Sequence, residues 1–487
     1  MELKKLASQT AIYGLSSMVG RFLNFLLVPL YTLQFLPEEY GVVTVLYAYV
    51  GFFAVLLSYG METAFFNFTR KDIPTEKVYA TGFYALLTTT LVFTGIALLL
   101  AQPIAIGIGY PNHPEYIRYF VLVLACDTIS VLPFALLRKQ NKALKFAAVK
   151  MLWIAVNVGL NLYFVYYGYQ KFAAGETILL FDPTIGVGYI FMANLIASVF
   201  TLFFLLPEFK FAQSKPDLTL LKQMLIYAWP LILVGFAGMI NELLDRIILK
   251  YLLPADTADF DIGIYGAFYK ISIAVTLFVQ AFRFAGEPFF FEKSKDQNAP
   301  ATYAKVMNYF VAICGLVFLT TMLFIHQIAP LIIRQKAYFT HEYALTIVPI
   351  LLMANVCLGI YYNLSIWYKL SEKTLLGSTV AIGGAVVTIV LNIMLVPTIG
   401  ILGSAITTLV AYGGMALAAY IMGQKHFPVP YQLSHILTYL AAALLFWYGH
   451  DYFLSQSASW LQIVTSLILI GLYTFMVFAM ERKQSRQ

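Results

Sequence analysis

Long apolar segments separated by short polar ones run along the whole chain. Most of these segments have the length of about 20 residues that an α-helix needs to cross a bilayer. The connection between residues 168 and 183 is unusually long, and we expect it to form an outside loop with a short hairpin or an interfacial helix. The pattern predicts about fourteen membrane-spanning helices, at residues 10–36, 41–66, 79–107, 116–137, 146–168, 186–207, 224–252, 264–285, 305–328, 342–367, 375–397, 401–422, 432–453 and 460–480.

Composition supports a membrane protein, because 61% of the 487 residues are hydrophobic and only 11% are charged. A soluble protein of this size needs far more charge on its surface. With the amino terminus inside the cell, 21 of the 31 lysine and arginine residues fall in cytoplasmic segments and 5 in outside segments. This bias predicts two cytoplasmic termini. It also explains the net charge of +7 without a nucleic-acid partner.

Signals of enzymatic chemistry are missing from the sequence. The three cysteines lie in apolar segments without metal-ligand spacing, and the six histidines form no HExxH pattern. No P-loop or nucleophile–base pair is evident. We therefore expect a protein that is not an enzyme and that has no cofactor. Any energy input is expected from a Na⁺ or H⁺ gradient, the membrane potential or the concentration of substrate.

The second half of the chain repeats the first. The stretch Asn24–Pro37 resembles Asn241–Pro254 at an offset of 217 residues, since both begin with Asn, share a Leu-Leu pair and end in Leu-Pro. Further matches follow in the same order with slowly growing offsets: Glu62 with Glu287, Arg138 with Lys369, Lys142 with Lys373 and Asn161 with Asn392.

Both copies begin in the cytoplasm, so the repeat is parallel, about an axis along the membrane normal. The predicted fold is an all-α polytopic membrane protein with two pseudo-symmetric six-helix lobes around a central cleft. The lobes comprise residues 1–211 and 212–430, and residues 431–487 add two helices with a basic cytoplasmic tail.

The first predicted helix has one polar face. Thr10, Gly14, Ser17, Arg21 and Asn24 are spaced four and three residues apart, which places them on one side of the helix. An arginine near the bilayer centre is costly unless it faces a polar cavity or a partner. Arg21 therefore contacts a substrate in a polar cavity, extends its side chain to the membrane interface, or pairs with a carboxylate of a neighbouring helix.

Short motifs resemble a known family. The pattern GR-x-x-x-F…LP-x-EYG up to Gly41, and the DR-x-x-L pattern at Asp245, Arg246 and Leu249, are similar to those of Wzx-type polysaccharide flippases. These flippases belong to the MOP superfamily, which also holds the MATE exporters and the lipid II flippases. The long loop after the fifth span departs from the family pattern and leaves the pairing of spans 5 and 6 open.

The resemblance implies a V-shaped, MATE-like transporter in the bacterial cytoplasmic (inner) membrane. It would move an undecaprenyl-diphosphate-linked oligosaccharide to the outer leaflet by alternating access, for cell-surface polysaccharide biosynthesis. Implied partners are membrane lipids, this lipid-linked oligosaccharide, and a polysaccharide polymerase and glycosyltransferases. A MATE-like exporter of small amphipathic molecules and a membrane enzyme of glycan assembly are the alternatives.

A diphosphate cannot cross hydrocarbon unaided, and arginine matches its oxygens well. Arg283 could instead be an ordinary cytoplasmic anchor, and Lys270 could extend outward to the interface. The residues predicted to contact substrate in the central cavity are Arg21, Asn24, Arg246, Lys270, Gln280 and Arg283.

The seventh predicted helix carries its own charged cluster. Glu242 and Arg246 are four residues apart, which favours a helical ion pair, although a phosphate site accounts for the cluster equally well. If Glu242 or Asp245 is unpaired, it becomes the candidate for binding a coupling ion. Four asparagines are expected to form hydrogen bonds between helices: Asn157, Asn161, Asn355 and Asn363.

Overall fold

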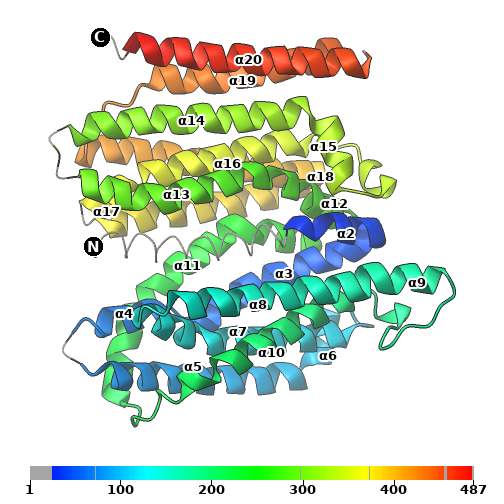
Figure 1. The fold of residues 1–487 in the computed structure, drawn as a ribbon, viewed down its shortest axis with the longest axis vertical. Helices are drawn as coiled ribbons and strands as arrows, with labels where there is room; N and C mark the ends of the chain where they lie inside the picture. Colours follow the sequence, from blue (N-terminus) through cyan, green and yellow to red (C-terminus); the bar gives the residue numbers. More distant parts are fainter. Residues whose placement is uncertain are drawn as a thin grey trace. The chain divides into compact units, whose positions relative to one another are not determined.

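The computed structural model describes residues 25–71, 73–294, 296, 298–371, 373–454 and 458–484. These residues form helices and connecting segments, with no strand among them (Figure 1). The all-α, multi-pass architecture is thus confirmed. Contacts between residues divide the chain into two compact units, Met1–Ile247 and Ile248–Gln487. The predicted boundary after residue 211 lies in the loop before helix α11, whereas the two compact units meet within that helix.

Unit 1 is built around α7, the helix of the fourth predicted span. It packs against α3, α4, α5 and α10, while α10 also packs against α8. Buried aliphatic and aromatic residues such as Leu132, Phe65 and Tyr79 fill the space between these helices. The helices of unit 1 are α2 (Val28–Gln34), α3 (Pro37–Ser58), α4 (Met61–Phe68), α5 (Thr75–Leu99), α6 (Ala101–Ile108), α7 (Pro114–Lys139), α8 (Ala143–Asn161), α9 (Tyr169–Ala173), α10 (Gly188–Phe209) and most of α11 (Leu218–Leu252).

The connection after α8 is more ordered than a simple loop. A π-helical segment, Leu162–Gly168, continues α8 into α9, so one helical stretch runs from Ala143 to Ala173. The chain then returns through a single 3₁₀ turn, Pro183–Ile185, and the Phe181 ring packs against Gly168. A Cβ atom at Gly168 would lie 2.5 Å from that ring, so a larger residue would push the loop away.

Unit 2 has a similar plan, with α16 in the place that α7 holds in unit 1. α16 packs against α12, α13, α14 and α18. The helices of unit 2 are α12 (Ala258–Tyr269), α13 (Ile273–Lys293), α14 (Ala299–Leu323), α15 (Ile325–Ile332), α16 (Ile347–Leu364), α17 (Ile366–Leu370), α18 (Thr374–His426), α19 (Leu433–Leu454) and α20 (Ser459–Gln484), with 3₁₀ segments at Lys270–Ser272 and Lys336–Phe339.

Two predicted spans of unit 2 lie within α18 as two helices joined at a break in the backbone. Within α18 the backbone leaves helical geometry at Ile399 and Gly400, and Gly400 has a φ of 56° that favours glycine. The spans predicted at 375–397 and 401–422 are the two helices on either side of this break.

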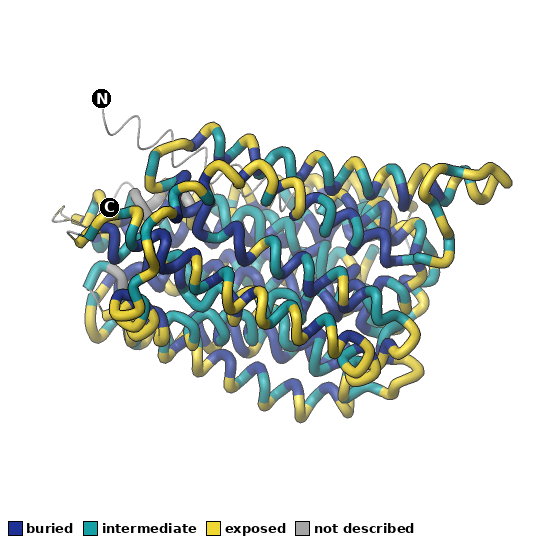
Figure 2. The backbone as a smooth tube through the Cα atoms, turned by 90° about the horizontal axis from the view of Figure 1, so that it is seen from below, coloured by how far each residue is buried: buried dark blue, intermediate teal, exposed yellow. Residues whose placement is uncertain are grey.

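Eleven helices are long and apolar enough to cross a membrane among the residues the structure describes. α18 counts once among them, and most of the first predicted span lies outside the described residues, so the total of fourteen stays a prediction. Buried and exposed residues alternate along many of the helices (Figure 2), as expected where one helix face packs against neighbours.

Candidate functional site

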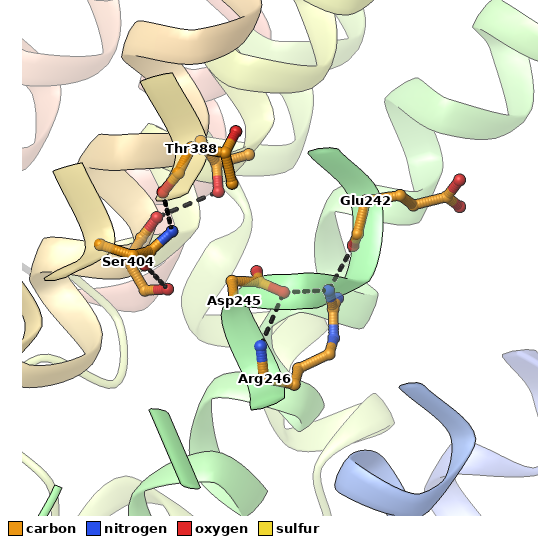
Figure 3. A network of polar contacts seen from close by, with 7 residues as sticks. Glu242, Asp245, Arg246, Thr388 and Ser404 are labelled. Atoms are coloured by element: carbon orange, nitrogen blue, oxygen red, sulfur yellow. Dashed lines mark hydrogen bonds and ion pairs between the residues drawn. The ribbon is translucent and has the colours of Figure 1, made fainter. Parts of the chain in front are cut away.

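The charged cluster of α11 is neutralised by neighbours in sequence. Arg246 Nη1 donates a hydrogen bond to Asp245 Oδ1 at 2.7 Å and another to the backbone carbonyl of Glu242, and the Arg246 backbone N–H donates to the same Asp245 oxygen at 2.8 Å (Figure 3). Asp245 and Arg246 are only 4% and 7% exposed. A buried arginine is therefore held with its charge balanced, as burial of an ion requires.

This geometry corrects the ion pair expected between Glu242 and Arg246. The guanidinium reaches the adjacent Asp245 and the carbonyl one turn back, so the Glu242 carboxylate takes no part and its residue is exposed (Figure 3). Of the two coupling-ion candidates, Asp245 is engaged by arginine and Glu242 is accessible. The role of either residue in ion binding stays a prediction.

In the eighth predicted span, Ser272, Thr276, Gln280 and Arg283 are spaced four, four and three residues apart and so share one face of the helix. Two of these residues take part in helix packing. Thr276 Oγ1 donates to Asn355 Oδ1 at 3.0 Å, and Asn355 Nδ2 donates to Ser272 Oγ at 3.1 Å. These bonds tie α13 and the 3₁₀ turn before it to α16, so Ser272 and Thr276 are not free to contact a substrate.

The other residues of this face differ in exposure. Gln280 is half-buried, whereas Arg283 is exposed, with its guanidinium carbon 4.7 Å from the centre of the Tyr362 ring. This distance is typical of a cation–π contact. Lys270 begins the 3₁₀ turn between α12 and α13, and is half-buried. Arg21 and Asn24 lie outside the described residues.

Of the four asparagines expected to bond between helices, Asn161 and Asn355 do so, whereas Asn157 bonds only to Asn161 of its own helix and Asn363 has no partner. Tyr31 Oη donates to Asn161 Oδ1 at 2.9 Å, and Asn161 Nδ2 donates to Asn157 Oδ1 at 2.8 Å. Asn363 is 2% exposed, yet neither of its amide atoms has a hydrogen-bond partner. The interhelical hydrogen bond expected for Asn363 is therefore not formed, because no polar side chain of the described residues reaches it.

Sequence reasoning missed Asp127, which lies in the middle of α7. Ser198 Oγ of α10 donates to Asp127 Oδ1 at 2.8 Å, and Trp153 Nε1 of α8 donates to Ser198 Oγ at 3.3 Å. The carboxylate also attracts the Lys150 ammonium electrostatically, although that ammonium rests on the Phe134 ring at 4.3 Å. An acidic residue at the centre of an apolar segment was the available signal.

Further ion pairs join the helix ends of unit 1. Arg138 of α7 pairs with Glu62 of α4, and Lys145 of α8 pairs with the buried Glu208 of α10 at 2.7 Å. In the sequence, Glu62 and Arg138 are two separate positions that match between the repeats, and the structure brings them together. Within the described part of the chain, no three His, Cys, Asp or Glu side chains are grouped as metal ligands.

Comparisons with known proteins agree with this architecture. The family described as "Polysaccharide biosynthesis protein" matches residues 6–292. The fold resembles that of the lipid II flippase MurJ in an inward closed conformation, with a TM-score of 0.72, 12% identity, and coverage of 96% of this chain and 98% of that one.

Two transporter structures are also similar. A multidrug resistance MATE family transporter of the MOP superfamily, facing inward, has a TM-score of 0.61 at 14% identity, over 85% of this chain and 94% of that one. A MOP superfamily transporter from Pyrococcus furiosus has a TM-score of 0.56 at 15% identity, over 86% and 95%. These likenesses show the fold. No curated protein matches the chain.

Proposed function

The chain belongs to the polysaccharide biosynthesis protein family, and from this premise we propose that it is a flippase for a lipid-linked oligosaccharide. The match over residues 6–292 is the observation that carries the proposal. The substrate would be a polyprenyl-diphosphate-linked glycan, which the protein moves between leaflets of the bacterial cytoplasmic membrane by alternating access. Glycosyltransferases would act on the same glycan before this step, and a polymerase would act on it afterwards.

Physical reasons favour such a substrate. The polyprenyl tail stays in lipid throughout, whereas the diphosphate and the sugars need a polar path with cationic contacts. The accessible Arg283, together with Arg21, would provide such contacts, while the buried Arg246 is balanced by Asp245. The lipid II flippase with the same fold supports a lipid-linked substrate.

Energy for transport would come from an ion gradient or from the substrate itself. Glu242 is the stronger candidate for an ion-coupling carboxylate, because Asp245 already accepts two hydrogen bonds from Arg246. A Glu242→Gln variant should lose any dependence of flipping on the ion gradient while it still binds substrate. An unchanged gradient dependence in this variant would remove Glu242 from the proposal.

Deletion of the gene provides the decisive test. Lipid-linked repeat units should accumulate in the inner leaflet, where an impermeant glycan-oxidising reagent labels them in inside-out vesicles but not in intact cells. Expression of the wild-type chain should restore labelling in intact cells. Normal outer-leaflet exposure in the deletion strain would overturn the proposal, and a simultaneous gain in sensitivity to amphipathic drugs would favour the exporter alternative.

A further inference from the structure

Two leucines in the loop after α9 are almost fully exposed. Leu179 and Leu180 are 76% and 78% exposed, among the highest values for large apolar side chains in the part of the chain that the structure describes. α9 and this loop lie at one end of unit 1, beyond the ends of α7 and α10 (Figure 1). Contact of such side chains with water is unfavourable. A loop that presents two of them side by side therefore needs a surface that covers them.

Tyrosine hydroxyls of the neighbouring helices hold the backbone of this loop. Tyr163 Oη donates a hydrogen bond to the Leu179 carbonyl at 3.0 Å, and Tyr189 Oη of α10 donates to the Leu180 carbonyl at 3.4 Å. The next residue, Phe181, stacks its ring on the Tyr189 ring with the two centres 5.4 Å apart. Contacts within unit 1 therefore fix the positions of both leucines and leave their side chains outside the packed core.

Leu180 also has a strained backbone. Its φ is 61°, in the left-handed region that glycine, asparagine and aspartate adopt far more readily than leucine. Such strain persists where other interactions compensate for it, and it is often found at functional positions. We therefore expect the Leu180 side chain to gain free energy from a contact that unit 1 alone does not provide.

The depth of the two leucines in the bilayer follows from the helix that begins with α8. Tyr163 lies twenty residues after Ala143, the first residue of α8, which corresponds to about 30 Å of helix and so to the thickness of the hydrocarbon core. Helix side chains lean toward the N-terminus, so the hydrogen bond from Tyr163 holds Leu179 near the hydrocarbon boundary. Tyr166 and Tyr167, which are 43% and 45% exposed, lie where aromatic belts of membrane proteins are found.

The exposed face of α8 leads up to the same loop and is entirely apolar. A helix face that lines a path for a polar substrate needs polar side chains, whereas a face toward lipid is apolar. The loop that folds back onto the end of this helix is therefore bordered by lipid. The exposed residues between positions 143 and 162 are Leu144, Ala148, Ala155, Gly159 and Leu162.

We propose that Leu179 and Leu180 insert into the bilayer, at the boundary between the acyl chains and the headgroups of the phospholipids on this side. The distribution of lysine and arginine predicts that this is the outer leaflet. Lys171 and Glu176, which lie further along α9 and the loop, form an ion pair at 2.7 Å and so keep their charges in the headgroup region. The inserted loop fixes the depth of unit 1 in the membrane at this end of α8.

The experiment places a nitrobenzoxadiazole fluorophore on Leu180→Cys in the full-length protein, with the three native cysteines replaced by alanine, in phosphatidylcholine nanodiscs. The matched control carries the fluorophore on Ala174→Cys, an exposed position about 15 Å further from the bilayer centre. Phosphatidylcholine brominated on its acyl chains should quench the probe at position 180 and not the probe at 174. Iodide should quench the probe at 180 at least about fivefold less than the probe at 174, because an anion does not enter hydrocarbon.

A second variant tests the side chain of Leu180 directly. Leu180→Asn relieves the backbone strain, since asparagine tolerates a positive φ, and it removes the apolar side chain. A fluorophore on Leu179→Cys should then become several times more accessible to iodide, while the thermal unfolding midpoint stays the same or rises.

Two outcomes would overturn the proposal. One is equal quenching by iodide at positions 180 and 174. The other is protection from iodide without quenching by brominated lipid, which would mean that a second copy of the chain covers the loop. Flipping activity does not enter these measurements, so the inference stands or falls apart from the proposed function.

Discussion

Asn161 of unit 1 and Asn392 of unit 2 occupy the same Leu-Asn motif, 231 residues apart, and behave alike. Each donates its amide to the carbonyl four residues earlier at 2.8 Å, and each accepts a hydroxyl from a different helical segment with its amide oxygen. The hydroxyl comes from Tyr31 in unit 1 and from Ser404 in unit 2 (Figure 3). The two units therefore repeat a structural device with different partners.

Charges in the membrane-spanning helices do not repeat in this way. The same spacing of 231 residues leads from Asp127 to Leu358 and from Lys150 to Ala381, and the spacing of 217 leads from Arg21 to Gly238. Scaffold contacts are thus shared between the copies, while these ionisable groups belong to the first copy. Groups that only hold helices together can recur in both halves, but a polar path for an anionic substrate needs charge where the substrate passes.

Arg21 gives the largest expected effect. Arg21→Ala should reduce flipping at least about 100-fold, because a diphosphate in the membrane loses a bidentate partner. The protein should still insert and keep its thermal unfolding midpoint in detergent. Arg21→Lys is the matched control and should retain part of the activity. Full activity of the alanine variant would assign Arg21 a purely structural role.

Asp127 and Lys150 can be replaced by leucine and alanine, the residues that the second copy has at the equivalent positions. Asp127→Leu leaves Lys150 without its electrostatic partner, and Lys150→Ala does the converse, so each single variant should lose about 2 kcal/mol of stability. The double variant should recover most of this loss, because no uncompensated charge remains. Denaturant titrations in detergent would measure both effects.

The outcome of this double-mutant cycle discriminates a functional pair from a structural one. If the pair takes part in transport, the double variant should fold normally and flip substrate poorly. Additive losses in the double variant would show that the two groups do not interact.

The sequence predicted the arrangement of helices better than the contacts of individual side chains. Hydrophobic segments of about 20 residues and the distribution of lysine and arginine are sufficient to place spans, because the bilayer imposes their length. The repeat predicted that Asn161 and Asn392 are equivalent, and their matching hydrogen bonds agree with this.

Partners of the charged residues could not be predicted, because they depend on rotamers and on which helices pack. Glu242 and Arg246 have favourable spacing, yet the guanidinium prefers Asp245 and a backbone carbonyl. Asp127 escaped notice because a single acid in an apolar segment forms no motif. Its importance follows only from the neighbour that the fold provides, Ser198 of α10.

Removal of the two motif asparagines should lower the stability of the protein by different amounts in the two units. Asn161→Ala should destabilise by about 2 kcal/mol, because it leaves the buried Tyr31 hydroxyl without a partner. Asn392→Ala should cost about 1 kcal/mol, since the Ser404 hydroxyl can turn to a carbonyl of its own helix. Thermal unfolding in detergent, with Tyr31→Phe and Ser404→Ala to complete each cycle, would measure the coupling. Equal coupling energies for the Asn161–Tyr31 and Asn392–Ser404 pairs would show that the two motifs contribute alike to stability.

The smallest effect is expected at the exposed start of α11, where an ion pair joins two helical segments of unit 1. Asp217 Oδ1 accepts the backbone N–H groups of Thr219 and Leu220 at 2.9 and 3.1 Å and so caps the helix, while Oδ2 pairs with Lys77 at 2.7 Å. The Lys77 ammonium, assisted by the two backbone amides, holds the pKa of the Asp217 carboxyl below its usual range.

Asp217→Asn keeps the cap and removes only the ion pair, so the unfolding midpoint at pH 7 should fall by about 1 °C. Because the pKa of the Asp217 carboxyl is lower in the folded than in the unfolded protein, its ionised form stabilises the fold at pH values above the unfolded pKa near 4. This stabilisation is lost as the pH falls through the folded-state pKa. Wild type and Asp217→Asn should therefore converge below about pH 4, whereas Asp217→Ala should remain less stable because it also lacks the cap. A difference between wild type and Asp217→Asn that persists at low pH would mean that the capping bonds, and not Lys77, set the contribution of this carboxylate.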